Sequence, residues 1–490
     1  MHNSQDLQKV LEIRDAILGG NEKRLKEQRD AGKLTARERV EKLADAGSFV
    51  ELFALVSQNE EGAGVITGYA TIEERPVYIF AQDFTVHGGA MGKAQAAKIV
   101  KLLDMAQKTG APVLALMDSA GVRIDEGAAA MSAYSEIYQK LARMSGVCPI
   151  VAVVLGPCIG GAALVTQLAD VAIVAEKVGQ LMVFGPQVMA AMNGLAVKPE
   201  ELGGAKVAAG MGACALTAAT EDEALLKAKQ VLALLPSSNL EDSEIIDTDD
   251  MSRLLPAIDP SDVDGLVAAL ADNASAIELY AAYESAVRVF LARMGGRTVG
   301  LVAASGKLSA GALQKAARFV RFMDCYNIPV VSLLNTCGVE VNGVKEQGWL
   351  FKAQSQLLYA YAEATTAKLA VVTGDAIGQA YVAMGGKANA DVTYAWPGAV
   401  ISALTPEAAV AVLYVGDVKA DKALSVEDAR AKYAGKYVEE VAGAVNAAKA
   451  GMVDDIIDPA KTRAMLISAM EMLASKRDSN PPKKHGNLPM

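Results

Sequence analysis

The chain has 490 residues and a formal net charge of −10, which favours two or more domains and gives no general attraction to nucleic acid or to an anionic membrane. Hydrophobic residues make up 52% of the chain and charged residues 21%, so the sequence has ample material for a buried core and no signature of disorder. Aromatic residues make up only 5% whereas glycine occurs 43 times, which argues against platforms that stack bases and favours close backbone approaches.

The elements predicted along the first half alternate between helix and strand. Residues 4–45 are polar with apolar residues at helical spacing, and we expect a surface helix or arm there, with no signal peptide before it. Two β-branched and aromatic runs then predict a hairpin over 65–81. Helices follow at 92–109, 128–144 and 161–168, with strands at 112–117 and 150–155. This alternation is typical of an α/β fold.

The composition changes near the middle of the chain. Nine acidic residues stand against one arginine between Glu241 and Asp264, and prolines punctuate the stretch. We place the domain boundary there, which predicts an N-terminal domain over 1–240 and a C-terminal domain over 256–490.

After that boundary the sequence repeats itself. The run Gly156-Pro-Cys-Ile-Gly-Gly-Ala162 recurs as Gly374-Asp-Ala-Ile-Gly-Gln-Ala380, an offset of 218 residues. The run Ala111–Val122 recurs as Ile328–Val339, an offset of 217. Further on, Phe184-Gly-Pro resembles Ala395-Trp-Pro-Gly, and we match these two segments as well. The chain is therefore interpreted as a duplicated domain.

Each copy predicts a strand, a glycine turn and a helix, so that backbone N–H groups at the start of the helix are open to a ligand. The amides of Gly160 and Gly161 in the first copy, and those of Gln379 and Ala380 in the second, can then hold an oxyanion or an enolate oxygen. The alternative is that these glycines serve only close packing between strand and helix.

Other chemistries lack their motifs. There is no phosphate-binding loop, no dinucleotide fingerprint and no Gly-x-Ser-x-Gly, and the histidines are His2, His87 and His485. We interpret His87 as a structural histidine and expect no catalytic metal. The five cysteines are scattered without metal-binding spacing, which indicates a reducing cytoplasm.

The chain resembles the carboxyltransferase (β-type) component of biotin-dependent acyl-CoA carboxylases, together with the α subunits of sodium-pumping acyl-CoA decarboxylases. The resemblance runs from about Arg24 to Met490. The motifs that carry it are Lys33-Leu-Thr-Ala-Arg-Glu-Arg39, Gly47-Ser-Phe-Val-Glu51, Ala81-Gln-Asp-Phe-Thr-Val86, Gly156–Ala162, Glu201-Leu-Gly-Gly-Ala-Lys206, Tyr394-Ala-Trp-Pro397 and Lys483-Lys-His-Gly-Asn487. It implies two tandem crotonase-like domains of ββα repeats in one chain.

The resemblance also implies roles and partners. The first domain would bind acyl-CoA and the second biotin, with sites formed between subunits of a homo-oligomer that is a dimer or a trimer of dimers. The chain has no Ala-Met-Lys-Met signal, so biotin would come on a separate carrier protein or domain, with a biotin carboxylase or a membrane decarboxylase subunit as further partners. Implied substrate-binding residues are Ala120, Gly121, Arg123, Gly378 and Val382, and Arg123 and Lys206 are candidates for the CoA phosphates.

Several positions depart from the family pattern. Ala120 replaces a glycine, and the second domain has Asn335-Thr-Cys-Gly-Val339 in place of Asp-x-Pro-Gly-Phe. Gln379 replaces a glycine beside the expected biotin, and Val382 stands where related enzymes discriminate acyl groups, which favours propionyl-CoA/methylmalonyl-CoA. Two alternatives stay open, a non-catalytic or altered-acceptor subunit of a mixed complex and an acyl-CoA reaction that uses only the first domain.

Overall fold

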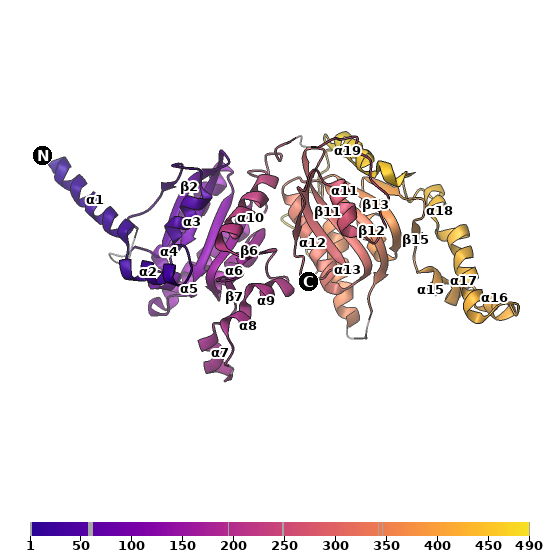
Figure 1. Ribbon diagram of the computed structural model, residues 1–490, viewed down its shortest axis with the longest axis horizontal. Coiled ribbons are helices and arrows are strands. Elements are labelled where there is room, and N and C mark those ends of the chain that lie inside the picture. The colour runs from indigo at the N-terminus through magenta and orange to yellow at the C-terminus, as the bar shows by residue number, and fades with distance from the viewer. Residues whose placement is uncertain are drawn as a thin grey trace. The chain divides into compact units, whose positions relative to one another are not determined.

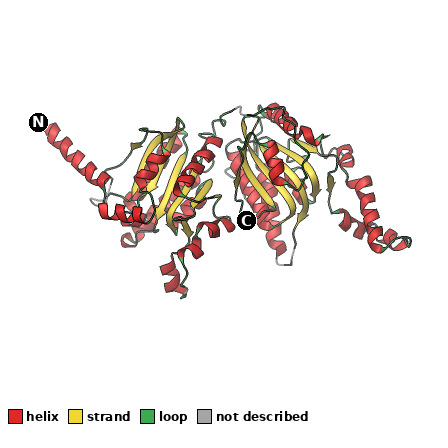
Figure 2. Ribbon diagram, viewed as in Figure 1, coloured by secondary structure: helices red, strands yellow, loops and turns green. Residues whose placement is uncertain are grey.

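The computed structural model describes residues 2–56, 62–194, 196–246, 249–341, 343–344 and 346–489. The chain divides into two compact units, Met1–Asp242 and Ser243–Met490, each built from a β-sheet with helices against it (Figures 1 and 2).

In the first unit the strands are β1 (Val50–Glu51), β2 (Val65–Ile72), β3 (Arg75–Gln82), β4 (Val113–Ser119), β5 (Ile150–Ile159), β6 (Val171–Ala175), β7 (Gln180–Met182) and β8 (Leu216–Ala218). Its helices are α1 (His2–Gly19), α2 (Glu22–Asp30), α3 (Ala36–Leu43), α4 (Lys93–Thr109), α5 (Ala128–Met144), α6 (Gly161–Leu168), α7 (Pro186–Asn193), α8 (Pro199–Gly203), α9 (Ala205–Gly210) and α10 (Glu221–Leu234).

In the second unit the strands are β9 (Ile277–Leu279), β10 (Val287–Met294), β11 (Arg297–Leu308), β12 (Val330–Val339), β13 (Lys368–Ile377), β14 (Val392–Ala395), β15 (Val400–Ser402) and β16 (Asp455–Ile456). Its helices are α11 (Val263–Leu270), α12 (Ala310–Cys325), α13 (Glu346–Glu363), α14 (Gln379–Met384), α15 (Pro406–Leu413), α16 (Val415–Ala420), α17 (Val426–Tyr437), α18 (Ala444–Lys449) and α19 (Thr462–Leu473).

The two sheets have the same topology. The first has the strand order β1-β2-β3-β4-β5-β6-β8 with β7 paired to β5, and the second has the order β9-β10-β11-β12-β13-β14-β16 with β15 paired to β13. In each, an antiparallel hairpin (β2–β3 or β10–β11) leads into parallel strands joined by helices. The predicted duplication, the hairpin and the α/β alternation are confirmed.

One predicted correspondence between the copies is wrong. Phe184 follows β7, whereas Trp396 follows β14, which is the counterpart of β6 and not of β7. The segment that matches Phe184-Gly-Pro is Leu404-Thr-Pro406, because β15 pairs with β13 as β7 pairs with β5. The offset there is 220 residues, close to the 218 of the glycine turn, whereas the match to Trp396-Pro397 has an offset of 211 and rests only on a proline near an aromatic residue.

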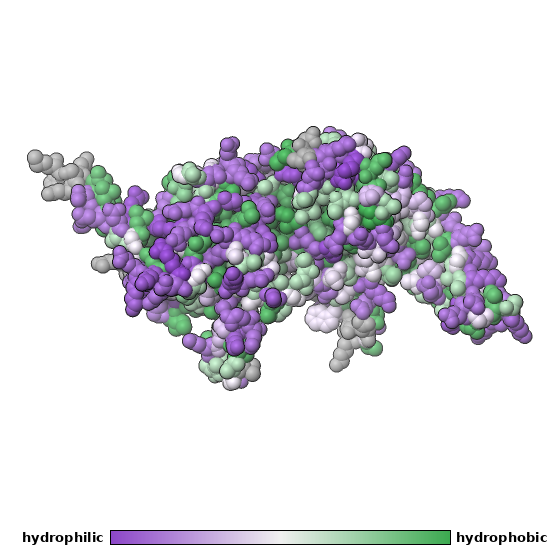
Figure 3. Space-filling view, viewed as in Figure 1, coloured by the Kyte–Doolittle hydropathy of each residue, from purple (hydrophilic) through white to green (hydrophobic). Residues whose placement is uncertain are grey.

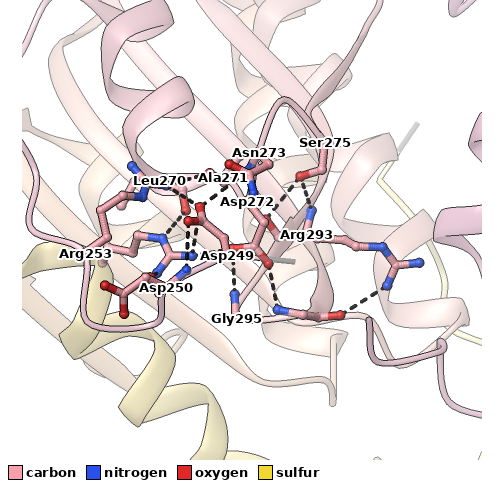
Figure 4. A network of polar contacts seen from close by, with 12 residues as sticks. Asp249, Asp250, Arg253, Leu270, Ala271, Asp272, Asn273, Ser275, Arg293 and Gly295 are labelled. Atoms are coloured by element: carbon pink, nitrogen blue, oxygen red, sulfur yellow. Dashed lines mark hydrogen bonds and ion pairs between the residues drawn. The ribbon is translucent and has the colours of Figure 1, made fainter. Parts of the chain in front are cut away.

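The acidic stretch at the boundary belongs to a polar network of the second unit, in which Asp249 and Asp250 lie close to Asp272 (Figure 4). Arg463 is fully buried and ion-pairs with Asp272, whose carboxylate also accepts the N–H groups of Gly295 (2.9 Å) and Gly296 (2.7 Å). Arg463 Nη1 donates to the Asp250 carbonyl at 2.7 Å. These acidic residues therefore take part in an internal polar network.

The two units each bury a lysine at an equivalent place, Lys98 and Lys315, and these two lysines give a pH prediction. Lys98 Nζ donates to the Val65 carbonyl at 2.6 Å, and Lys315 Nζ donates to the Tyr283 carbonyl at 2.7 Å. Burial lowers the pKa of both side chains to about 8. Between pH 8 and the ordinary lysine pKa of about 10.4, the unfolded chain therefore binds more protons than the folded chain. The contribution of these lysines to the free energy of unfolding consequently increases as the pH rises.

We expect the free energy of unfolding of the wild type, minus that of Lys98→Met, to rise between pH 8 and 10 and to be flat from pH 6 to 7. Denaturant titrations at each pH measure this difference. Lys101 lies on the exposed side of the same helix, so the free energy of unfolding of Lys101→Met should depend on pH as that of the wild type does. A Lys98→Met difference that does not change with pH would contradict the prediction.

Candidate functional site

The glycine turn of the first unit joins β5 to α6. Gly160 has φ 62° and ψ −117°, in the left-handed half of backbone space that favours glycine, and α6 begins at Gly161. The Gly160 N–H donates to the Met182 carbonyl of β7 at 2.8 Å. The predicted use of the Gly160 amide as an oxyanion donor therefore does not fit this structure, because that N–H already has an acceptor. The N–H groups of Gly161 and Ala162 lie in the first turn of α6, which has no intrahelical acceptors for them.

Gly161 is required at the start of α6 by two tyrosines of α5. A Cβ atom on Gly161 would lie 2.6 Å from the Tyr134 ring and 2.7 Å from Tyr138 Oη, closer than real Cβ contacts. Tyr138 Oη donates to the Gly161 carbonyl at 3.1 Å, and Tyr134 Oη donates to the Gly121 carbonyl at 3.1 Å. Burial raises the pKa of both tyrosines, so both remain donors at neutral pH.

The second unit repeats the turn with a different side chain. Gly378 has φ 66° and ψ −144°, its N–H donates to the Ser402 carbonyl of β15 at 2.9 Å, and α14 begins at Gln379. The Gln379 side chain is exposed, so it does not fill the space at the helix start. The N–H groups of Gln379 and Ala380 thus occupy the places of Gly161 and Ala162. Val382 is exposed one turn further along α14.

The loop after β4 lies beside the first turn. Ala120 donates its N–H to the Gly88 carbonyl at 2.9 Å, and Gly121 donates its N–H to Ser119 Oγ at 3.2 Å. A Cβ on Gly121 would lie 3.2 Å from the Ile159 carbonyl, which places this loop against the end of β5. Ala120 and Gly121 therefore line the turn, but their own N–H groups are occupied.

The two residues predicted to meet the CoA phosphates differ in their surroundings. The Arg123 guanidinium pairs with Asp125 at 2.5 Å and with Glu126 at 3.4 Å, so two carboxylates of its own loop neutralise its charge. Lys206 is exposed on α9. His87 lies with Arg24, Lys33 and Phe84 in the wall of a cavity of about 370 Å³, and its φ of 50° is unusual for a residue with a side chain.

Sequence reasoning missed a buried ion network behind the turn. Arg39 and Asp118 are fully buried, and their side chains meet at 2.8 Å. Arg39 also pairs with Glu221 at 2.8 Å, and Lys33 Nζ pairs with Asp118 at 2.6 Å. Burial lowers the pKa of Lys33, although Asp118 opposes that shift. The only sequence signal was the motif Lys33–Arg39, whose spacing by itself does not identify the partners.

A second missed contact lies in the copy of this region. Cys337 Sγ of β12 lies 3.6 Å from Asp375 Oδ2 of β13. Of the five cysteines, all free, Cys148, Cys158 and Cys214 are buried, Cys325 is exposed and Cys337 is half-buried. Within the described ranges, no group of three histidine, cysteine or acidic side chains is arranged to hold a metal ion.

Across the described residues, no helix is both long enough and apolar enough to cross a membrane.

Comparisons with known proteins bear on this geometry. The carboxyl transferase domain model matches residues 27–488. The chain is 39% identical to methylmalonyl-CoA decarboxylase subunit alpha of Veillonella parvula, over 96% of both chains, and 39% identical to a putative propionyl-CoA carboxylase beta chain of Bacillus subtilis, over 96% of this chain and 97% of that one. It superposes on the transcarboxylase 12S structure that has methylmalonyl-CoA and methylmalonic acid bound, with a TM-score of 0.93 at 37% identity, covering 99% of this chain and 98% of that one.

That superposition confirms the predicted two-domain crotonase-like fold. The chain belongs to the carboxyl transferase family and is an acyl-CoA carboxyltransferase of the class that contains propionyl-CoA carboxylase beta chains and methylmalonyl-CoA decarboxylase alpha subunits.

Proposed function

We propose that this chain moves carboxylate between carboxybiotin and a short acyl-CoA, with propionyl-CoA and methylmalonyl-CoA preferred. The observation that carries the proposal is the repeated turn, in which Gly160 and Gly378 adopt the same conformation and each leaves two helix-start amides without an intrahelical acceptor. The similarity to a methylmalonyl-CoA decarboxylase subunit alpha, and the methylmalonyl-CoA bound in the 12S structure, support the choice of acyl group.

In this mechanism the first unit holds the acyl-CoA and the second holds biotin. The N–H groups of Gly161 and Ala162 would bind the thioester oxygen, and those of Gln379 and Ala380 the ureido oxygen. Backbone donors fixed before the reaction stabilise negative charge as it develops on an oxygen. Biotin, when bound, supplies the carboxylate and a ring nitrogen that exchanges the α-proton. The chain's own residues then bind and orient the two groups, and no side-chain base is required.

The second unit fits biotin at the level of the backbone. Its two amides survive the change from glycine to Gln379 because they belong to the main chain, and the new side chain is exposed. The sequence has no Ala-Met-Lys-Met signal, so we propose that biotin arrives on a separate carrier protein or domain, in the cytoplasm. A biotin carboxylase or a membrane decarboxylase subunit would complete such a complex.

Equivalent apolar side chains are exposed around both turns, and we propose that a homo-oligomer covers them. Leu164, Phe184 and Met192 are exposed in the first unit, and Val382, Leu404 and Val412 are their counterparts in the second. Hydrophobic residues interrupt the hydrophilic surface in the regions of α7 and α15 (Figure 3). Side chains exposed at the same positions of both copies are better explained by burial in an assembly than by chance.

Phe184→Asp and Leu404→Asp are each expected to reduce the assembled mass, because a buried carboxylate without a partner opposes association. Light scattering after size-exclusion chromatography measures it. Leu240→Asp is the matched control, since Leu240 is 90% exposed in the boundary segment and should leave the mass unchanged. Wild-type mass in both patch variants would contradict the proposed assembly.

The decisive experiment measures decarboxylation of methylmalonyl-CoA and malonyl-CoA by the purified chain, with and without free biotin. Turnover that depends on biotin is expected, and its ratio between the two substrates ranks the acyl groups. Turnover without biotin would instead favour a reaction that uses the first unit alone.

The rewritten second unit, with Cys337, Asp375 and Gln379, favours one alternative, a non-catalytic or altered-acceptor subunit of a mixed complex. Intact binding of the CoA ester with no turnover would support it. An active, stable homo-oligomer would count against it.

A further inference from the structure

The two copies distribute charge differently where their paired strands end. In the first unit the buried position at the end of β4 is Asp118, neutralised by Lys33 and Arg39, and the facing residue on β5 is Pro157. In the second unit the position equivalent to Asp118 is the neutral, half-buried Asn335, and the residue equivalent to Pro157 is Asp375 on β13. The carboxylate has thus moved from behind the site to its half-buried edge.

Asp375 is held firmly in that position. Its N–H donates to Asn335 Oδ1 at 3.1 Å, and a Cβ on the preceding Gly374 would lie 2.3 Å from the same oxygen, so the strands are in close contact. Cys337 Sγ lies 3.6 Å from Asp375 Oδ2, and among the described residues this is the one polar contact of the carboxylate. Burial, and then Asp375, raise the pKa of the Cys337 thiol, so it stays protonated at neutral pH.

A carboxylate offers about four lone-pair positions, and the thiol occupies one of them. The others are available to a donor that approaches the end of β13, where Gln379 begins α14 four residues after Asp375. Amide donors beside a carboxylate acceptor complement the edge of a cyclic urea, which presents a carbonyl oxygen next to a ring N–H.

We infer that Asp375 accepts a hydrogen bond from the ring N–H of a cyclic urea whose carbonyl is held at the second turn, and so fixes which ring nitrogen faces the acyl-CoA. This inference rests on the proposed function, because it assigns biotin to the second unit. Asp375 is a positioning residue here and takes no part in proton transfer. The first copy has Pro157 at this place and cannot make the same contact.

The kinetic test uses Asp375→Ala and Asp375→Asn with free biotin as the varied substrate. Loss of a hydrogen bond to a charged acceptor is expected to raise the biotin concentration for half-maximal rate roughly 10- to 100-fold in Asp375→Ala. Asp375→Asn, which keeps an oxygen acceptor, should lie between that variant and the wild type. The KM for methylmalonyl-CoA should change less than about twofold, because the first unit is untouched.

Glu407→Gln is the matched control for loss of charge. Glu407 is exposed on α15 and adds to the negative field at Cys337, but it has no contact with the thiol, and Lys307 of β11 is the cation that opposes that field. The biotin concentration for half-maximal rate of Glu407→Gln should match that of the wild type. An unchanged value in Asp375→Ala, while the wild type depends on biotin, would overturn the inference.

A second test is independent of turnover. Free biotin should slow alkylation of Cys337 by iodoacetamide in the wild type but not in Asp375→Ala, and the exposed Cys325 is the internal reference, with both sites read by peptide mass. Without biotin, Cys337 should react faster in Asp375→Ala, because the neighbouring anion is gone. Protection of the wild type without biotin-dependent turnover would support this inference and reject the proposed reaction. No protection of the wild type would overturn the inference.

Discussion

Gln379→Pro is expected to lower the rate of biotin-dependent decarboxylation of methylmalonyl-CoA by about 10²- to 10³-fold, the loss typical of one oxyanion-hole donor. Proline lacks the N–H that Gln379 presents at the first position of α14, but its fixed φ suits that position, so the helix should persist. The preceding Gly378 has the freedom that a residue before proline needs. Steady-state rates at saturating biotin measure the effect.

Gln379→Ala is the matched control, because it removes the same side chain and keeps the N–H. It should retain at least half of the wild-type rate. Circular dichroism and the thermal midpoint of both variants establish that they are folded. The equivalent test in the first unit is less clean, since any side chain at Gly161 meets Tyr134 and Tyr138. A proline variant as active as the alanine variant would reject the Gln379 amide as a donor.

Arg39→Met is expected to destabilise the first unit by about 3 to 5 kcal/mol, because it leaves two buried carboxylates with one cation. Arg39 is fully buried between Asp118 and Glu221, with ion-pair distances of 2.8 Å to each. Methionine fills similar volume, so lost packing contributes little. Denaturant titration followed by hydrogen exchange in β4 and β5 reports on this unit alone, which matters because the chain has two units and need not unfold in one step.

Lys42→Met is the control for Arg39→Met. Both residues lie on α3 and pair with neighbouring acids of α10, Lys42 with Asp222 at 2.6 Å, but the surface pair has side chains 46% and 65% exposed. Such pairs are worth about 0 to 1 kcal/mol. Equal destabilisation by the two substitutions would show that the buried network stabilises the unit no more than a surface ion pair does.

Much of the architecture was predictable because it is recorded in periodicity and repetition. The helices at 128–144 and 161–168 begin and end where the sequence places them, and the duplication was visible from the matched runs around Gly156 and Gly374. The match at Phe184 failed because an aromatic residue and a proline also occur nine residues before the true counterpart, at Trp396-Pro397, and only strand pairing reveals which segments correspond.

The site was predicted less completely. The turns were located, but it could not be predicted that the Gly160 N–H is already hydrogen-bonded. Its acceptor, the Met182 carbonyl, lies 22 residues away and reaches the turn through the pairing of β7 with β5. The network of Lys33, Arg39, Asp118 and Glu221 spans 188 positions of sequence. No local pattern reports such contacts. The assignment of each unit to acyl-CoA or biotin stays a prediction.

The hydrogen bonds of Gly160 to Met182 and of Gly378 to Ser402 have a consequence for how such an enzyme can be studied and how it can diverge. They fix the direction of the following amides through main-chain atoms alone, so the side chain at the start of α14 can vary without loss of the donor, as Gln379 shows, whereas Tyr134 and Tyr138 restrict the start of α6 to glycine. Replacement of Gln379 by any residue except proline would leave the N–H donor intact. The small effect of such a variant would wrongly suggest that position 379 is unimportant. Replacement of a single amide by an ester, which deletes only the donor hydrogen, is the substitution that addresses the group directly.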